Sequence, residues 1–162
     1  MRIVSVLPRD RYLAGTAWVE ADPEAGGAVL HGPVRARGEA DNASAAKANN
    51  VQEDPTRSFG DHPYGTYLVT EVVRVPPGGQ RRTYRPFFLR LRPVGGEAWQ
   101  ARLNGRDGLG AHGGALHTDG RLRETFGCLR VDDATAEAWA ELVTIELTAG
   151  RHVVYECREA KS

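Results

Sequence analysis

The chain has 162 residues, a length that fits one domain whose core is large enough to fold without disulfides or metals. Basic and acidic side chains number 21 each, and this balance argues against a nucleic-acid or polyanion binder. No apolar stretch reaches membrane-spanning length, and Pro8 follows the first apolar residues too soon for a secretory signal. We therefore expect one soluble domain over residues 1–162, with no nucleic-acid partner, no membrane and no export signal.

Short apolar runs are interrupted by 19 glycines and 9 prolines, which is typical of a protein built from strands and turns. In chain order, these runs predict strands at residues 2–7, 16–20, 28–37, 66–75, 87–92, 98–103, 145–147 and 152–157. One short amphipathic helix is expected after Asp132-Asp133, which can cap it. Its apolar face carries Trp139, Leu142 and Val143 at helical spacing. The prediction is a mainly β fold.

Residues 39–61 differ from the rest, because Asn, Ala, Asp and Ser dominate and no period of two persists. They are interpreted as a long surface excursion that has room for a short helix at residues 43–48. Long loops in compact domains often carry function, so we expect this segment to flank a site.

The chemistry is expected around Cys128, which follows Gly127 and lies sixteen residues after His112. A thiol attacks carbonyl groups as the thiolate, so it needs a neighbouring base at neutral pH. Thr125 and Arg130 on either side favour a reactive environment, although a cysteine after glycine is more often a small buried apolar residue. The second cysteine, Cys157, lies in the last apolar run, and we interpret both as free thiols.

His112, set among glycines, is the candidate general base, and a backbone carbonyl could hold its Nδ1 proton. The alternative is a loop histidine in solvent. His117 is a rival base, or a residue that lines the cleft. Zinc on these histidines and Cys128 is a third option without the usual ligand spacing, so no metal and no cofactor are expected. The remaining histidines, His31, His62 and His152, are interpreted as ordinary surface or hydrogen-bonded residues.

His112-Gly113 followed by Thr125-x-Gly127-Cys128-Leu129-Arg130 resembles the active-site signature of the YkuD-type L,D-transpeptidases. Residues 60–67 resemble that family's Thr-Pro-x-Gly-x-Tyr/Phe strand opening, and the helix after Asp132-Asp133 resembles its short helix after the cysteine. The similar region runs from about residue 59 to residue 143. Phe126 stands where most members have histidine, and the interval between His112 and Cys128 is slightly shorter than usual.

The resemblance implies a single-domain β-sandwich or barrel-like fold and a cysteine acyltransferase acting on peptidoglycan stem peptides. Cys128 would be the nucleophile, His112 the base, and Gly113 the source of the carbonyl that orients the imidazole. The amides of Gly127 and Cys128 would form the oxyanion hole. The candidate substrate contacts are Tyr64, His117, Thr125, Phe126 and Arg130.

The acyl acceptor would be an amine, a free D-amino acid or water, giving transpeptidation, exchange or carboxypeptidation. Peptidoglycan lies outside the cytoplasm, so the protein is expected in the periplasm or cell wall of the producing cell or of a target cell. It would reach that place through a leader removed beforehand, or as an interbacterial effector with a secretion-carrier or immunity partner. The alternatives are a cytoplasmic Cys/His amidase and a catalytically silent module that recognises stem peptides or a protein, since Phe126 could cover the sulfur.

Overall fold

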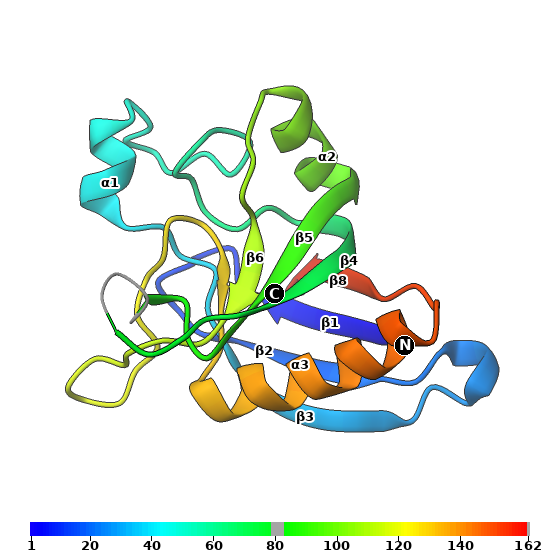
Figure 1. The fold of residues 1–162 in the computed structure, drawn as a ribbon. Helices are drawn as coiled ribbons and strands as arrows, with labels where there is room; N and C mark the ends of the chain where they lie inside the picture. Colours follow the sequence, from blue (N-terminus) through cyan, green and yellow to red (C-terminus); the bar gives the residue numbers. More distant parts are fainter. Residues whose placement is uncertain (79–82, 162) are drawn as a thin grey trace.

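The computed structural model describes residues 1–78 and 83–161. The fold is mainly β, with one eight-stranded sheet in the order β3-β2-β1-β8-β4-β5-β6-β7 (Figure 1). The pairs β1–β8 and β6–β7 are parallel, and the other neighbours are antiparallel. The strands are β1 (Arg2–Leu7), β2 (Gly15–Glu20), β3 (Val29–Ala36), β4 (Gly65–Arg74), β5 (Phe87–Gly95), β6 (Gly110–His112), β7 (Leu129–Arg130) and β8 (Val154–Glu159).

The two ends of this sheet meet, so it forms a nearly closed, barrel-like structure. Arg37, directly after β3, exchanges both backbone hydrogen bonds with Arg130 of β7, at 2.9 and 2.8 Å. Ala40 continues the contact through isolated bridges to Thr125 and Phe126. Closing a sheet on itself satisfies the backbone groups of its edge strands. The predicted mainly β, barrel-like architecture is therefore confirmed.

The helices that lie wholly within residues 1–78 and 83–161 are α1 (Asn42–Lys47), α2 (Gly96–Leu103), α3 (Asp133–Thr148) and the 3-10 helix η1 (Pro23–Ala25). Helix α3 begins where the Asp132 side chain accepts from the Thr135 amide at 2.7 Å. It contacts β3, β4, β5 and β6, and it runs beside β3 in Figure 1 with α1 and α2 at the opposite end. Its Trp139 and Val143 are fully buried against the core, which matches the apolar face expected for this helix.

The prediction of one short helix was wrong in two respects, whereas the short helix considered at residues 43–48 is present. Residues 98–103 form helix α2 and not a strand, because Ala98 and Ala101, one turn apart, are the buried positions, while the bulky Trp99 and Leu103 are exposed. Residues 145–147 continue α3, where packing of the helix overrides the strand propensity of an exposed Ile145. The third helix, α1, lies where a short helix was considered.

Two short strands, β6 and β7, were missed altogether. Both lie in segments rich in glycine and polar residues, where three residues or fewer leave no readable period. Strand β6 carries His112, and β7 begins directly after Cys128. The hydrophobic pattern of the sequence therefore did not predict the two strands that position the candidate site. No helix among residues 1–78 and 83–161 combines the length and the apolar character needed to cross a membrane.

Candidate active site

The pairing of β6 with β7 brings His112 and Cys128 to the same part of the sheet. His112 lies opposite Arg130 in the parallel register, and Cys128 is two positions before Arg130. Side chains two positions apart in an extended chain point to the same face, so both residues project to the face of His112. The Cys128 Sγ is 3.7 Å from the carbonyl oxygen of Gly108, in the segment that leads into β6.

His112 is fully buried, and its tautomer follows from its partner. The ring Nδ1 lies 2.7 Å from the carbonyl oxygen of Gly113, which can only accept, so Nδ1 carries the proton. Nε2 is left as a free acceptor: it is buried and has no hydrogen-bond partner among residues 1–78 and 83–161. Phe88 stacks on the ring and Tyr84 contacts it edge to face, with centroids 5.7 and 4.8 Å away. A basic nitrogen is thus held in a fixed direction.

Burial keeps both reactive groups uncharged at neutral pH. It lowers the pKa of His112 to about 3, and the nearby Arg130 guanidinium acts in the same direction. Burial also raises the pKa of Cys128 to about 11, although hydrogen bonding from Gly110 and the charges of Arg106 and Arg130 oppose this shift. At neutral pH the Cys128 thiol and the His112 imidazole are therefore both uncharged. In such a pair the proton moves during attack on a carbonyl and not before it.

The turn before Cys128 is held by the hydroxyl of Thr125. This oxygen accepts from the Gly127 amide and donates to the Cys128 carbonyl, both at 2.9 Å. Gly127 has φ of +101°, and a Cβ at this position would meet the Arg106 guanidinium and the Gly60 carbonyl. Arg106 cannot easily yield, because its Nη2 donates to Gly60 at 2.6 Å and its Nη1 to Asp61 at 2.8 Å. Only glycine fits this position.

The two amides expected in an oxyanion hole differ in their environment. The Gly127 N–H is already donated to Thr125. The Cys128 N–H donates to no other residue in the part of the chain that the structure describes. The Cys128 amide is therefore the one of the two that is available to a ligand.

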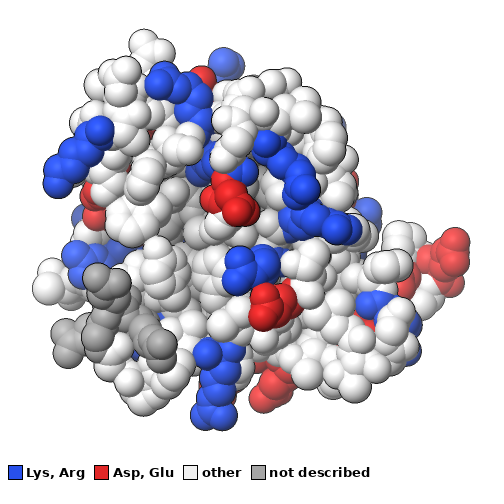
Figure 2. Space-filling view, turned by 45° about the horizontal axis from the view of Figure 1, so that its top comes forward, with Lys and Arg blue, Asp and Glu red and all other residues white. Residues whose placement is uncertain are grey.

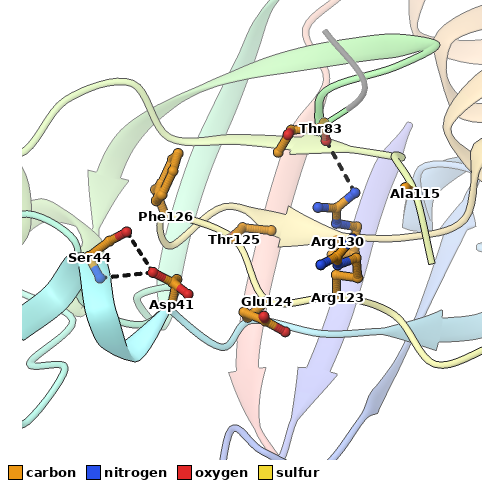
Figure 3. Close-up of a pocket in the computed structure, with 9 residues that line it drawn as sticks. All are labelled: Asp41, Ser44, Thr83, Ala115, Arg123, Glu124, Thr125, Phe126 and Arg130. Carbon is orange, nitrogen blue, oxygen red and sulfur yellow. Dashed lines mark hydrogen bonds between the residues drawn. The ribbon is translucent and has the colours of Figure 1, made fainter. Parts of the chain in front are cut away.

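Two cavities lie on either side of Phe126. The larger, of about 440 Å³, is drawn in Figure 3, with Phe126 and Ser44 toward one end and Arg130 and Arg123 toward the other. The smaller, of about 190 Å³, extends from Phe126 along Phe59 to Gly108, the residue whose carbonyl contacts the thiol. Cys128 is 5% exposed, so its side chain is nearly covered, whereas Phe126 is 47% exposed and lines both cavities.

The larger cavity has charges of both signs on its wall. Arg123 and Arg130 face it together with Asp41 and Glu124. Asp41 and Ser44 come from the start of α1, so the excursion over residues 39–61 flanks the site, as expected. The same mixture continues on the face shown in Figure 2, where basic and acidic side chains lie among one another. Such a wall suits a ligand that carries both carboxylate and ammonium groups.

Arg130 is 2% exposed, and its guanidinium is hydrogen-bonded to backbone carbonyls of the site. Its Nη1 donates to the carbonyls of Gly113, at 2.6 Å, and Thr83, at 3.1 Å. A Cβ on Gly114 would meet this guanidinium, which explains the second glycine after His112. Arg130 thus supports the motif from within and also lines the larger cavity.

Two candidate substrate contacts lie elsewhere. His117 pairs with Glu124 through Nε2 at 3.0 Å, and both side chains are about 30% exposed. The Tyr64 hydroxyl donates to the Leu7 carbonyl at 3.2 Å, while the Arg11 guanidinium lies 3.9 Å above its ring. Neither residue lines the two cavities beside Phe126. The structure thus places Tyr64 in packing with Arg11 and places His117 in a partly exposed contact with Glu124.

Four residues that organise the site were missed or given other roles. Arg106 blocks any side chain at Gly127, and Tyr84 packs on His112. Asp133, expected only as a helix cap, accepts from the Gly114 amide at 2.6 Å and so fixes the turn after His112. His62, set aside as an ordinary histidine, is fully buried and contacts the Gly127 carbonyl. The sequence does not indicate that these residues contact the site around Cys128. Each is either distant from Cys128 in the chain or contacts the site only through backbone atoms.

Among residues 1–78 and 83–161, no group of three or more His, Cys, Asp or Glu side chains is arranged to hold a metal ion. Cys128 and Cys157 are both free and buried.

Comparison with models of known protein families gives no match to this chain, and no curated protein sequence matches it either. The functional assignment therefore depends on the geometry of the site and on the resemblance of its motif.

Proposed function

We propose that this protein is a cysteine acyltransferase of the L,D-transpeptidase type that acts on peptidoglycan stem peptides. One observation carries the proposal above all others. The His112 imidazole is held through Nδ1 by the adjacent Gly113 carbonyl, with a buried and unpartnered Nε2, on the strand that pairs beside Cys128. The resemblance implies this carbonyl-oriented base, and a histidine merely packed in a core would normally have both nitrogens satisfied.

The proposed reaction begins with the neutral pair. As the Cys128 sulfur attacks the carbonyl carbon of an L-centre residue, the thiol proton moves to His112 Nε2 and the S–C bond forms. The peptide C–N bond then breaks, and His112 returns the proton to the departing D-alanine amine. The resulting thioester passes its acyl group to an amine, a D-amino acid or water, with His112 again as the base.

The Cys128 amide supports the proposal as an oxyanion donor. It is free for a ligand, whereas the Gly127 amide is held by Thr125. Removing one such donor typically costs about 10²–10³ in rate. In this proposal Thr125 shapes the turn that carries the nucleophile, and the cavity along Arg123, Arg130 and Glu124 receives the charged groups of the stem peptide.

The substrate class also implies a place of action. We propose that the protein works in the periplasm or cell wall of its own cell or of a neighbouring one. In the second case a secretion carrier would deliver it, and an immunity protein would protect the producer.

Intact-mass measurement after incubation with a carbapenem tests the proposed chemistry, because enzymes that resemble this family acylate their cysteine with such compounds. The expected result is a mass increase of one adduct, which is lost in Cys128→Ala and retained in Cys157→Ala. Incubation of purified muropeptides with and without a free D-amino acid then separates cross-linking, exchange and trimming. Muropeptides that remain unchanged, with no adduct on Cys128, would overturn the proposal.

A second candidate is a catalytically silent module that recognises stem peptides or a protein, and the near-complete burial of Cys128 favours it. If the protein is such a module, iodoacetamide should leave Cys128 unmodified, and muropeptides should bind without being converted. A cytoplasmic Cys/His amidase would instead acylate a small amide substrate while leaving muropeptides intact.

A further inference from the structure

A chain of buried hydrogen bonds runs from the centre of the sheet to the residue before the nucleophile. Ser5 of β1 lies 2.7 Å from the Tyr155 hydroxyl of β8, and that hydroxyl lies 3.0 Å from His62 Nε2. His62 Nδ1 lies 2.9 Å from the carbonyl oxygen of Gly127. Ser5, Tyr155 and His62 are each fully buried.

The direction of the bonds follows from the last acceptor. The Gly127 carbonyl can only accept, so His62 donates from Nδ1, and its Nε2 accepts the Tyr155 proton. The Ser5 hydroxyl then donates to Tyr155. Burial lowers the pKa of His62 to about 3, in keeping with one proton on the ring. Every ring polar atom of His62 is thus satisfied, unlike Nε2 of His112.

His62 is itself held on all sides. Its own amide donates to the Gly38 carbonyl at 2.7 Å, and its carbonyl accepts from Arg11 at 3.0 Å. Its ring stacks on Tyr67, with centroids 5.5 Å apart and planes 14° from parallel. A ring fixed in this way presents its Nδ1 proton in one direction only.

The Gly127 carbonyl and the Cys128 amide belong to the same peptide unit. In a trans peptide the C=O and N–H bonds point in opposite directions. Since His62 draws the carbonyl toward the core, the Cys128 N–H must point away from the core. Rotation of this peptide would turn the carbonyl outward and remove the donor. Such a rotation changes ψ of Gly127 and φ of Cys128, and Gly127 has no Cβ to restrict its ψ, so a hydrogen bond from outside the turn is needed to fix the peptide.

We propose that His62 is a positioning residue that fixes the Gly127–Cys128 peptide so that the Cys128 amide serves as the oxyanion donor. This inference rests on the proposed acyl transfer for its kinetic consequence, while the peptide orientation itself stands on the hydrogen bonds alone. His62 touches neither the thiol nor the carbonyl under attack, and it acts only through the backbone.

Two variants of His62 separate the two ring nitrogens. The amide nitrogen of Asn occupies about the position of Nδ1, so His62→Asn keeps a donor for Gly127. The amide of Gln reaches about the position of Nε2, so His62→Gln keeps a partner for Tyr155 and loses the donor. Tyr155→Phe is the matched control, because it removes the outer hydrogen bond and leaves the one to Gly127 in place.

Two reactions of the same thiol provide the readout. Acylation by a carbapenem passes through an oxyanion, whereas alkylation by iodoacetamide does not. We expect His62→Gln to lower the acylation rate constant by about 10²-fold, with alkylation changed by no more than about threefold. His62→Asn and Tyr155→Phe should keep the ratio of the two rates within about tenfold of wild type. Loss of both reactions in parallel, or of neither, in a folded His62→Gln protein would overturn the proposal.

Nuclear magnetic resonance of the wild-type protein tests the orientation without any variant. The ¹⁵N shifts of His62 should show a proton on Nδ1, in close contact with Gly127, from pH 5 to pH 8. A proton on Nε2 would overturn the inference even if His62→Gln fails to fold. A wild-type thiol that is alkylated but never acylated would overturn the proposed function instead, and these spectra would then decide alone whether His62 holds the peptide.

Discussion

His112 and Arg130 donate to the same oxygen, the carbonyl of Gly113, at 2.7 and 2.6 Å. The shared acceptor fixes the imidazole and brings a guanidinium close to it, and this charge opposes protonation of the ring. Burial lowers the pKa of His112 most, and Arg130, which shares the carbonyl that orients the ring, lowers it further. A carboxylate in the position of Gly113 would have the opposite effect on the pKa of His112.

The first prediction concerns the identity of the base. His112→Ala should slow acylation by a carbapenem by about 10²–10⁴-fold, because the thiol then has no acceptor for its proton. His117→Ala should change the rate by less than about threefold, since His117 is paired with Glu124 at the surface. Intact-mass time courses measure both rates. The reverse order of effects would exchange the roles of the two histidines.

The second prediction concerns pH. Burial raises the pKa of Cys128 to about 11, so the thiolate fraction, and with it alkylation by iodoacetamide, should rise about tenfold per pH unit from pH 7 to pH 10. Acylation by a carbapenem should stay nearly constant from pH 5 to pH 9, because the thiol and His112 are both neutral there. A rate of alkylation that levels off between about pH 9 and pH 10 would mean that the thiol ionises with an ordinary pKa of about 8.5, contrary to this account.

The sequence predicted the mainly β fold, whereas the chemistry that its motif suggests stays a prediction. The turn from Thr125 to Cys128 could be read from the sequence because residues so close in the chain lie together in any fold, whereas His112 approaches it only through the pairing of β6 with β7. The strands 2–7 and 66–75 were readable because they alternate or carry β-branched residues over six positions or more. The contacts of His62 and Arg106 with the turn at Gly127 were not readable, because they depend on how distant strands close the sheet.

Helix α2 shows a different limit. Its buried positions are the small residues Ala98 and Ala101, while Trp99 lies at the surface. A pattern based on bulky apolar residues follows the wrong face of such a helix. Its place is set by close packing at Gly65, where a Cβ would meet Ala98 and the Gly95 carbonyl.

The third prediction concerns Gly127. Gly127→Ala combines a left-handed φ with a clash against Arg106 and the Gly60 carbonyl. The left-handed φ alone costs about 1–2 kcal/mol, so the free energy of unfolding should fall by clearly more than this amount. Gly26→Ala is the matched control, since Gly26 has φ of +95° with nothing within 4 Å of its Cβ position. Urea unfolding of both variants measures the difference. Equal losses would show that Arg106 yields to the added methyl group.

The fourth prediction concerns stability in acid. His112 has a pKa of about 3 in the folded state and about 6.5 when unfolded, so the unfolded chain binds more protons between these values. The free energy of unfolding should therefore fall as pH decreases through this window, by up to about 1.4 kcal/mol per pH unit from this residue. His112→Gln should have a shallower slope between pH 6.5 and pH 4 in urea titrations. Identical slopes would contradict a buried, neutral His112.

The seam between Arg37 and Arg130 places Cys128, the proposed nucleophile, close to where the barrel is joined. The residues that meet there are remote in the chain, so this seam forms only when the whole sheet has closed. A ligand bound beside Cys128 would brace this junction from outside. Hydrogen exchange of the Arg37 and Arg130 amides should then be slower in the presence of a ligand than in its absence. This difference would show that the site is occupied.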